Sequence, residues 1–220
     1  MNEPAEKETS FDFRARYFTT GQLGPQTRQV WVVLHGYGQL SQYFIRKFNT
    51  LTSRQIYVIA PEGLSRFYLS ELTDQGRKDN RVGATWMTRE NRLMDIDNYI
   101  RYLDAVFHRE LAEYTDTPVT MFGFSQGCAT ACRWAVQGNI HFDRIILWAG
   151  IFPPDMDFSA AHDAMQGKEI TMVCGRQDPY LTEERLAEFD ELARKLQVTP
   201  KKLFFDGRHE IAEDVLLNLL

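Results

Sequence analysis

The 220-residue sequence has little cysteine, no excess of basic residues and no long hydrophobic run. Cys128, Cys132 and Cys174 are too few for a disulfide-dense scaffold and form no CxxC pair, so we expect a reducing compartment, the cytoplasm, and no metal site. Thirty acidic residues against 25 basic ones give a net charge of −5, which argues against a nucleic-acid partner. The longest apolar runs, 30–34 and 145–152, fall far short of the roughly 20 residues of a membrane helix.

The composition is that of a globular protein, with 44% hydrophobic, 13% aromatic and 25% charged residues. A chain of this length buries about 70% of its extended surface on folding, so one large core is expected. Residues 1–10 are polar and predict an N-terminal tail, and residues 11–220 predict a single domain. We find no internal repeat and no linker-like tract.

Short β-branched or aromatic runs alternate with stretches of helical periodicity. The runs are nearly continuous rather than alternating, which is typical of strands buried on both faces of a parallel sheet. They lie at residues 30–34, 56–60, 119–122, 145–148 and 170–173. Residues 88–114 predict the longest helix, and alternating aromatics in 11–18 predict an antiparallel edge strand. The fold class is therefore α/β, a single mostly parallel sheet flanked by helices.

Residues 63–88 show no clear periodicity and mix aromatic with charged side chains. Loops of this length in compact domains are usually functional or mobile, so we expect a long loop here. The basic residues Arg77, Lys78 and Arg81 are interrupted by Asp79 and are interpreted as a solvated surface, with anionic headgroup recognition as the alternative.

The clearest chemical motif is a G-x-S-x-G sequence, Gly123 to Gly127, between a predicted strand and a predicted helix. A serine at the apex of such a turn needs a strained backbone, and its flanking positions must be small. Ser125 is therefore the candidate nucleophile. Cys128 directly after the motif is interpreted as a buried small residue rather than a second nucleophile.

A second glycine turn, His35-Gly36-Tyr37-Gly38, follows the first buried strand. Backbone N–H groups at such a strand end can stabilise an oxyanion, and we assign this role to Tyr37 and Gln126. The alternative is an ordinary turn that ends a strand.

A serine nucleophile requires a histidine as base and a carboxylate to orient it. Of five histidines, His209 follows a short predicted strand and a turn, and it is expected to open a terminal helix; His35 is expected to fix its own loop. Asp178 follows the strand at 170–173 and is the preferred carboxylate, with Asp206 as the competitor.

In this order, VVLHGYG, VIAPEG, GFSQG, GRQDP and GRHEI resemble α/β-hydrolases of the phospholipase/carboxylesterase group, which includes the acyl-protein thioesterases. The resemblance spans about residues 30–211 and implies an α/β-hydrolase fold with Ser125, Asp178 and His209 as the triad. It also implies Tyr37 and Gln126 as oxyanion donors and no cofactor. Many relatives have a glycine where Cys128 stands, and often a Trp-aromatic-Asp sequence where this chain has Ala-Thr-Trp-Met at 84–87.

These observations predict a serine carboxylester hydrolase acting on short to medium acyl esters, with a small-molecule ester as its partner. Aromatic or apolar residues near the predicted site are candidates for substrate binding: Trp86, Met87, Phe152 and Tyr180. A thioesterase or acyltransferase with the same triad, or a small-molecule sensor with little turnover, are the alternatives. The sequence leaves the oligomeric state open, a homodimer included.

Overall fold

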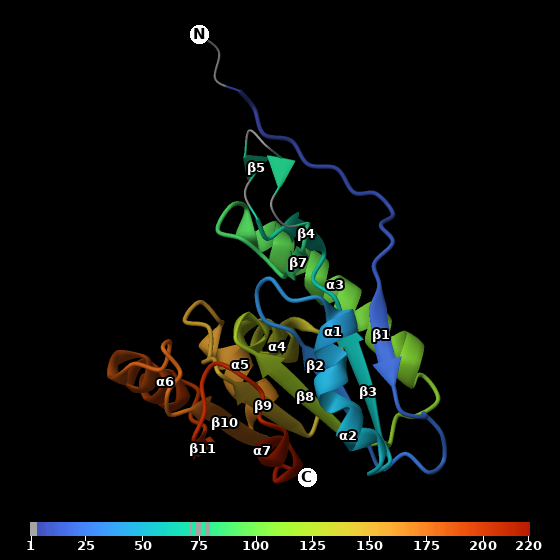
Figure 1. Ribbon diagram of the computed structural model, residues 1–220, viewed down its shortest axis with the longest axis vertical. Coiled ribbons are helices and arrows are strands. Elements are labelled where there is room, and N and C mark those ends of the chain that lie inside the picture. Colours follow the sequence, from blue (N-terminus) through green and yellow to red (C-terminus); the bar gives the residue numbers. More distant parts are fainter. Residues whose placement is uncertain (1–3, 71, 74–75, 78–79) are drawn as a thin grey trace.

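The structure, a computed structural model, describes residues 4–70, 72–73, 76–77 and 80–220 (Figure 1). Its centre is a seven-stranded sheet in which all neighbours are parallel except the first pair. In spatial order the strands are β1 (Tyr17–Thr20), β3 (Ile56–Pro61), β2 (Gln29–Leu34), β8 (Val119–Phe124), β9 (Arg144–Trp148), β10 (Glu169–Gly175) and β11 (Lys201–Phe205). The predicted fold class is confirmed.

Successive residues of the central strands face opposite sides of the sheet, and each side is covered by helices. In β2, Val30 and Val32 enter one core cluster while Trp31 and Val33 enter the other. The first cluster lies under α3 (Arg92–Leu111), α4 (Gln126–Gln137), α5 (Phe158–Met165) and α6 (Glu183–Lys195). The second lies under α1 (Ser41–Phe44), the 3₁₀ turn η1 (Ile45–Phe48), α2 (Asn49–Thr52) and α7 (Glu213–Leu217).

The edge strand lies later in the chain than predicted. β1 pairs antiparallel with β3, but only from Tyr17 opposite Pro61 to Thr20 opposite Val58. β3 ends at Pro61, so residues 11–16 have no strand to pair with, and Phe11 and Phe13 are exposed. Figure 1 shows this segment running away from the sheet. The prediction of a strand over 11–18 was therefore wrong for most of its length.

The segment 63–88 is not a structureless loop. β4 (Ser65–Tyr68) pairs antiparallel with β7 (Val82–Thr85), and β5 (Leu72–Thr73) pairs with β6 (Gly76–Arg77). Figure 1 shows both pairs on the same side of the molecule as the N-terminal segment, away from the central sheet. The strands, of two to four residues each, are too short to produce a clear period in the sequence. Lys78 and Asp79, from the basic cluster, lie outside the described residues.

The long helix is shorter than its predicted span of 88–114. Asn91 at its start has a left-handed backbone with φ of 42°, so the helical conformation begins at Arg92 and continues to Leu111.

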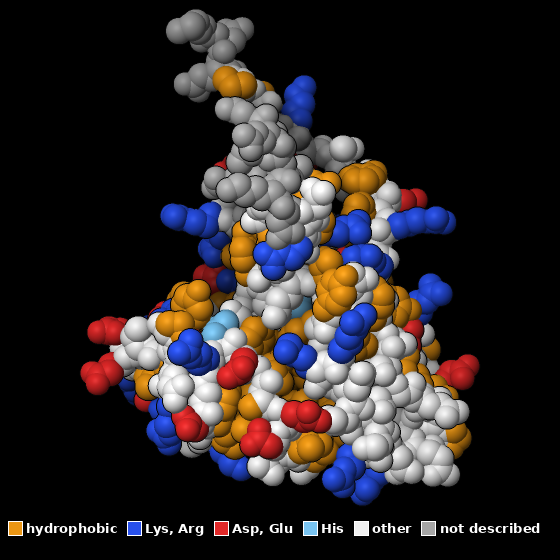
Figure 2. All heavy atoms as spheres, viewed as in Figure 1, with side chains coloured by type: hydrophobic (Ala, Val, Ile, Leu, Met, Phe, Trp, Pro, Cys, Tyr) orange, Lys and Arg blue, Asp and Glu red, His pale blue; other side chains and the backbone are white. Residues whose placement is uncertain are grey.

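No helix among the described residues is long and apolar enough to cross a membrane. Figure 2 shows acidic and basic side chains interspersed with hydrophobic ones over the lower part of this face.

Candidate active site

Ser125 occupies a sharp turn between β8 and α4. Its backbone has φ of 53° and ψ of −115°, a conformation that is strained for a residue with a side chain. Two hydrogen bonds stabilise the turn. The N–H of Ser125 donates to the carbonyl of Trp148 at 2.9 Å, and the N–H of Cys128 donates to the carbonyl of Ser125 at 3.0 Å. Ser125 therefore lies between the last residue of β8, Phe124, and the first residue of α4, Gln126.

The two glycines of the motif are required by close packing of backbones. A Cβ on Gly127 would lie 2.1 Å from the carbonyl oxygen of Leu34, and one on Gly123 would lie 2.5 Å from the carbonyl oxygen of Gly127. Cys128 is fully buried, and burial raises the pKa of its thiol well above the usual range. Its Sγ contacts the carbonyl of Gly123 at 3.1 Å, in agreement with a buried small residue that stays protonated.

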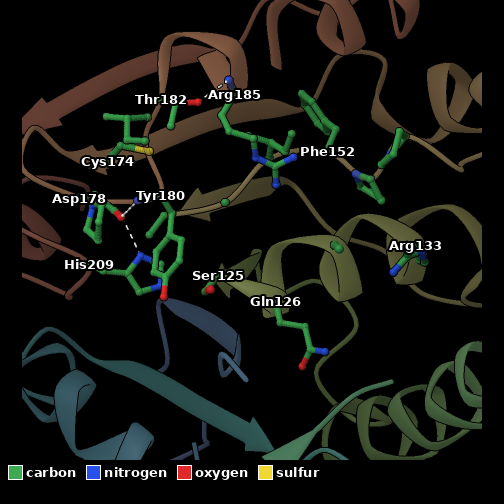
Figure 3. Close-up of a pocket in the computed structure, with 18 residues that line it drawn as sticks. Ser125, Gln126, Arg133, Phe152, Cys174, Asp178, Tyr180, Thr182, Arg185 and His209 are labelled. Carbon is green, nitrogen blue, oxygen red and sulfur yellow. Dashed lines mark hydrogen bonds and ion pairs between the residues drawn. The ribbon is translucent and has the colours of Figure 1, made fainter. Parts of the chain in front are cut away.

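His209 and Asp178 form a direct contact, with Nδ1 of the ring 2.7 Å from Oδ2 of the carboxylate (Figure 3). The other oxygen of Asp178, Oδ1, accepts from the N–H of Tyr180 at 2.9 Å. The Asp178 side chain is 2% exposed and that of His209 is 23% exposed. A proton on Nδ1 leaves Nε2 of His209 as the free acceptor.

His209 lies on the connection between β11 and α7, because the terminal helix begins four residues later at Glu213. The expectation that His209 opens this helix is corrected. The competing carboxylate, Asp206, is exposed and accepts from Nε2 of Gln177 at 2.6 Å. It is therefore Asp178 that contacts the imidazole.

Ser125, Asp178 and His209 line one cavity of about 520 Å³. In Figure 3 the His209 ring lies between Asp178 and Ser125. The three side chains follow the ends of β8, β10 and β11, and the carboxyl ends of parallel strands meet at one edge of the sheet. The structure thus brings together the three residues that the sequence selected for the triad.

His35 fixes the glycine turn from inside the protein. It is completely buried, its Nδ1 donates to the carbonyl of Gly36 at 2.7 Å, and its Nε2 accepts from the N–H of Gly63 at 2.9 Å. Burial lowers the pKa of His35 to about 4, so the ring is neutral at pH 7 and both nitrogens keep these roles.

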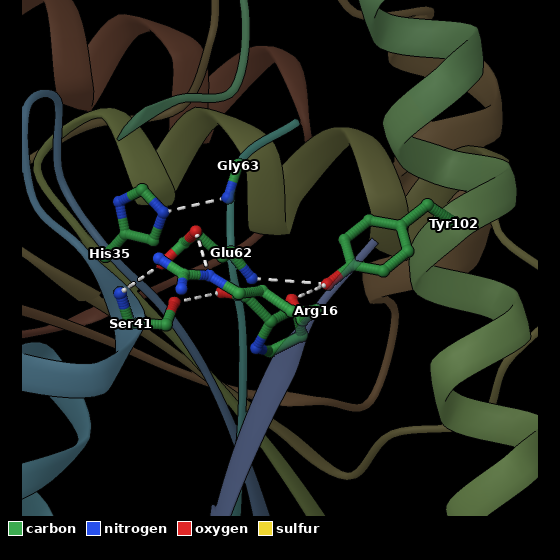
Figure 4. A network of polar contacts seen from close by, with 7 residues as sticks. Arg16, His35, Ser41, Glu62, Gly63 and Tyr102 are labelled. Atoms are coloured by element: carbon green, nitrogen blue, oxygen red, sulfur yellow. Dashed lines mark hydrogen bonds and ion pairs between the residues drawn. The ribbon is translucent and has the colours of Figure 1, made fainter. Parts of the chain in front are cut away.

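A polar network around the buried Glu62 supports the same turn (Figure 4). Oε1 of Glu62 accepts from Nε of Arg16 at 2.6 Å, and Oε2 accepts from the N–H of Ser41 at 3.2 Å. The hydroxyl of Tyr102 donates to the carbonyl of Arg16 at 2.7 Å and accepts from the N–H of Glu62 at 3.2 Å. This buried carboxylate therefore has an ionic partner and further hydrogen bonds, the condition under which burial of a charge is tolerated.

The N–H groups on both sides of Tyr37 are engaged. Gly36 donates to Oε1 of Gln39 at 2.8 Å and Gly38 donates to the carbonyl of Ala84 at 2.8 Å. Within the described part of the chain the N–H of Tyr37 itself donates to no other group, which leaves it free for a ligand. Gln126 begins α4, where an N–H has no carbonyl one turn back to bond with.

Trp86 and Met87 do not line the cavity. The Trp86 side chain is buried, and its indole N–H donates to the carbonyl of His35 at 2.9 Å. Its backbone N–H donates to Oε1 of Gln126 at 3.2 Å, and Nε2 of Gln126 donates to the carbonyl of Met87 at 3.0 Å. This segment contacts both the glycine turn and the start of α4, and a part for Trp86 and Met87 in substrate binding stays a prediction.

Phe152 and Tyr180 do line the cavity. Phe152 stacks on Phe189 with ring centroids 5.0 Å apart, and the ring of Tyr180 meets His209 edge-on at 4.8 Å. Sequence reasoning missed Arg133 and Arg185, which also line it. The helical spacing from Gln126 to Arg133 is a signal that points to the first, whereas nothing in the sequence marks the second.

Known proteins share the family and the fold of this chain. The family model described as Phospholipase/Carboxylesterase matches residues 21–219. Among solved structures, acyl-protein thioesterase 2 from Zea mays aligns with a TM-score of 0.70 and 16% identity over 94% of this chain and 96% of that one. Esterase PE8 aligns with a TM-score of 0.67 and 17% identity over 94% and 96%. The Bacillus cereus carboxylesterase aligns with a TM-score of 0.63 and 14% identity over 93% of this chain and 91% of that one. No curated protein is a significant match in sequence.

Proposed function

Because the chain belongs to the phospholipase/carboxylesterase family, we propose that it is a serine hydrolase that cleaves carboxylic esters through an acyl-enzyme on Ser125. The observation that carries the proposal is the 2.7 Å contact between Nδ1 of His209 and Asp178 in the cavity that Ser125 also lines. That contact supports a fixed tautomer with Nε2 free to take a proton.

In the first half-reaction, Nε2 of His209 takes the proton of the Ser125 hydroxyl as Oγ attacks the ester carbonyl carbon. The resulting imidazolium is stabilised by Asp178. When the tetrahedral intermediate collapses, the bond to the alkoxide breaks and His209 gives its proton to the leaving alcohol. Ser125 is then acylated.

In the second half-reaction, His209 takes a proton from water as the water oxygen attacks the acyl carbon. The bond to Ser125 Oγ breaks, the serine regains the proton, and the carboxylic acid leaves. In both half-reactions the N–H groups of Tyr37 and Gln126 donate to the developing oxyanion. One such donor typically contributes about 10²–10³ in rate. No step requires a group other than these side chains, the backbone and water.

The experiment is turnover of p-nitrophenyl esters from acetate to laurate by the wild-type protein and by Ser125→Ala. We expect sustained hydrolysis of short to medium chains by the wild type and a loss of about 10⁴-fold or more in the variant. The free energy of unfolding of the variant checks that it is folded. Wild-type rates in a folded Ser125→Ala protein would refute the proposal, and release of a single equivalent of p-nitrophenol would favour a sensor.

A further inference from the structure

The cavity extends from Ser125 along one face of α4. Gln126, Ala129 and Arg133 line it, and their spacing of three and four residues puts them on the same face of the helix. Arg133 is eight residues beyond Ser125, so it lies about 12 Å farther along the helix axis. Figure 3 shows Ser125, Gln126 and Arg133 in this order along α4.

The lining of the cavity is mostly apolar. The apolar residues include Ala129, Ile151, Phe152, Pro153, Pro154 and Leu181. Two guanidinium-bearing residues, Arg133 from α4 and Arg185 from α6, line the cavity, and Figure 3 shows the side chain of Arg185 reaching into it. Among the described residues that line it, the single carboxylate is Asp178, and Asp178 is hydrogen-bonded to His209.

The charge around Arg133 is incompletely balanced. Its Nη2 donates to Oδ1 of Asp155 at 2.7 Å, but Oδ2 of the same carboxylate also accepts from Arg92. Two guanidiniums therefore share one carboxylate and leave one net positive charge. Nη1 of Arg133 faces Sδ of Met87 at 3.5 Å, and a thioether is a weak acceptor. The Arg92 side chain is 41% exposed and that of Arg133 only 7% exposed, so water reaches the cluster mainly at Arg92, and an anion beside the poorly solvated Arg133 is stabilised.

Arg185 is differently placed. It is half exposed and forms an ion pair with Glu188 at 2.7 Å. The pair is neutral as a whole, but a guanidinium has five N–H groups and one carboxylate does not use them all. Arg185 can therefore add hydrogen bonds to an anion without adding net charge.

Building on the proposed function, we propose that the cavity selects esters one half of which ends in an ionised carboxylate, such as half-esters of linear dicarboxylic acids. The ester carbonyl lies at Ser125, the methylene chain follows the apolar walls, and the carboxylate pairs with Arg133 and Arg185. The planar carboxylate matches the guanidinium fork, and its single charge matches the single unbalanced charge of the Arg92, Asp155 and Arg133 cluster. A phosphate dianion exceeds that charge.

The test compares kcat/KM for ethyl hydrogen suberate with that for ethyl octanoate, which has the same acyl length but no charge. We expect the wild type to prefer the half-ester by about tenfold or more, the effect of one hydrogen-bonded ion pair in a poorly solvated site. A third substrate, 6-acetoxyhexanoate, is an acetate ester that carries the carboxylate on its alcohol half. Comparing its kcat/KM with that of the half-ester shows which half of the substrate enters the cavity.

Arg133→Gln and Arg185→Gln should each lower this ratio several-fold. Arg101→Gln serves as the control, because Arg101 is an exposed arginine of α3 paired with Asp97, and it should leave the ratio unchanged. If Arg133→Gln does not fold, the ratio measured for Arg185→Gln tests the inference alone, because the Arg185 side chain is half exposed. Equal kcat/KM for both substrates overturns the inference, as does a stronger preference for the phosphonate analogue of the half-ester. No Ser125-dependent hydrolysis of ethyl octanoate or of the half-ester would instead refute the proposed function.

Discussion

At the scale of single residues, the site depends on which carboxylate holds His209. Asp178 and Asp206 both follow strands of the sheet, and the sequence favours Asp178 with Asp206 as the competitor. In the folded chain Asp178 contacts Nδ1 of the ring, while Asp206 is exposed and bound to Gln177. The roles of the two aspartates should therefore differ sharply in kinetics.

We expect Asp178→Asn to lower kcat by about 10³–10⁴, because an amide cannot stabilise the imidazolium and favours the wrong tautomer. The matched variant, Asp206→Asn, should retain most of the activity. Steady-state kinetics on p-nitrophenyl acetate, with circular dichroism to confirm folding, measures both. A large loss in Asp206→Asn together with an active Asp178→Asn would reverse the assignment.

His35 gives a second prediction at this scale, one of stability against pH. Burial lowers its pKa to about 4 in the folded protein from an ordinary 6.5, so the unfolded chain binds more protons between these values. The stabilisation is complete above about pH 7 and is lost as the pH falls through 6.5 towards 4. At pH 5 the loss is about 2 kcal/mol.

Urea unfolding at about pH 7.5 and pH 5 measures this loss. His35→Gln has no titratable group at this position, so its free energy of unfolding should change less between the two pH values, by about the same 2 kcal/mol. An unaltered pH dependence in the variant would contradict the buried neutral imidazole.

Ser125, Asp178 and His209 could be selected from the sequence as candidates because each stands beside a strand end with its own turn residues. The placement of Trp86 could not be predicted, since an aromatic residue can equally line a cavity or fill a core. In the fold its indole N–H binds His35. Arg133 and Arg185 were missed because only the folded chain brings residues of α4 and α6 to the lining of one cavity.

At the scale of elements, the excursion between β3 and α3 supports the glycine turn. β7 approaches residues 36–39 so closely that Gly38 donates to Ala84 and Ala84 donates back to Gln39, at 2.8 and 3.1 Å. The aromatic rings of Tyr37 and Phe67 also lie 5.1 Å apart. Sequence periodicity could not reveal these contacts, because they depend on the tertiary pairing of very short strands.

Gly83 allows this approach, and it provides a test of the element's role. A Cβ there would lie 2.5 Å from the carbonyl oxygen of Gly38, so Gly83→Ala must displace the backbone that carries the N–H of Tyr37. We expect kcat to fall by about ten- to a hundredfold with a smaller change in KM, because an oxyanion donor acts mainly in the transition state.

Gly24→Ala is the matched control, since a Cβ at Gly24 has no atom within 4 Å. Its kcat should equal that of the wild type. A folded Gly83→Ala protein with the wild-type kcat would show that the position of the glycine turn does not limit the reaction.

At the scale of the whole molecule, the parallel sheet explains why residues far apart in the chain meet. The candidate nucleophile, acid and base follow β8, β10 and β11, whose carboxyl ends share one edge of the sheet. Continuous hydrophobic runs predicted these strands, because each is covered on both faces. They could not predict the short outer strands or the shift of β1 to Tyr17–Thr20, since both depend on where a neighbouring strand ends.

One rival nucleophile lines the same cavity. Cys174 is buried, and burial followed by the charge of Asp178 raises the pKa of its thiol to about 11, so it is protonated at pH 7. A reagent that reports covalent attack therefore has to distinguish the serine from this thiol.

Ser125 is proposed as the group that forms the covalent intermediate. This role is measured directly by the intact mass of the wild type, Ser125→Ala and Cys174→Ala after brief exposure to a fluorophosphonate at about pH 7.5. We expect a single adduct on the wild type and on Cys174→Ala, and none on Ser125→Ala. An adduct that persists in Ser125→Ala, or a wild-type protein that takes none, would contradict it.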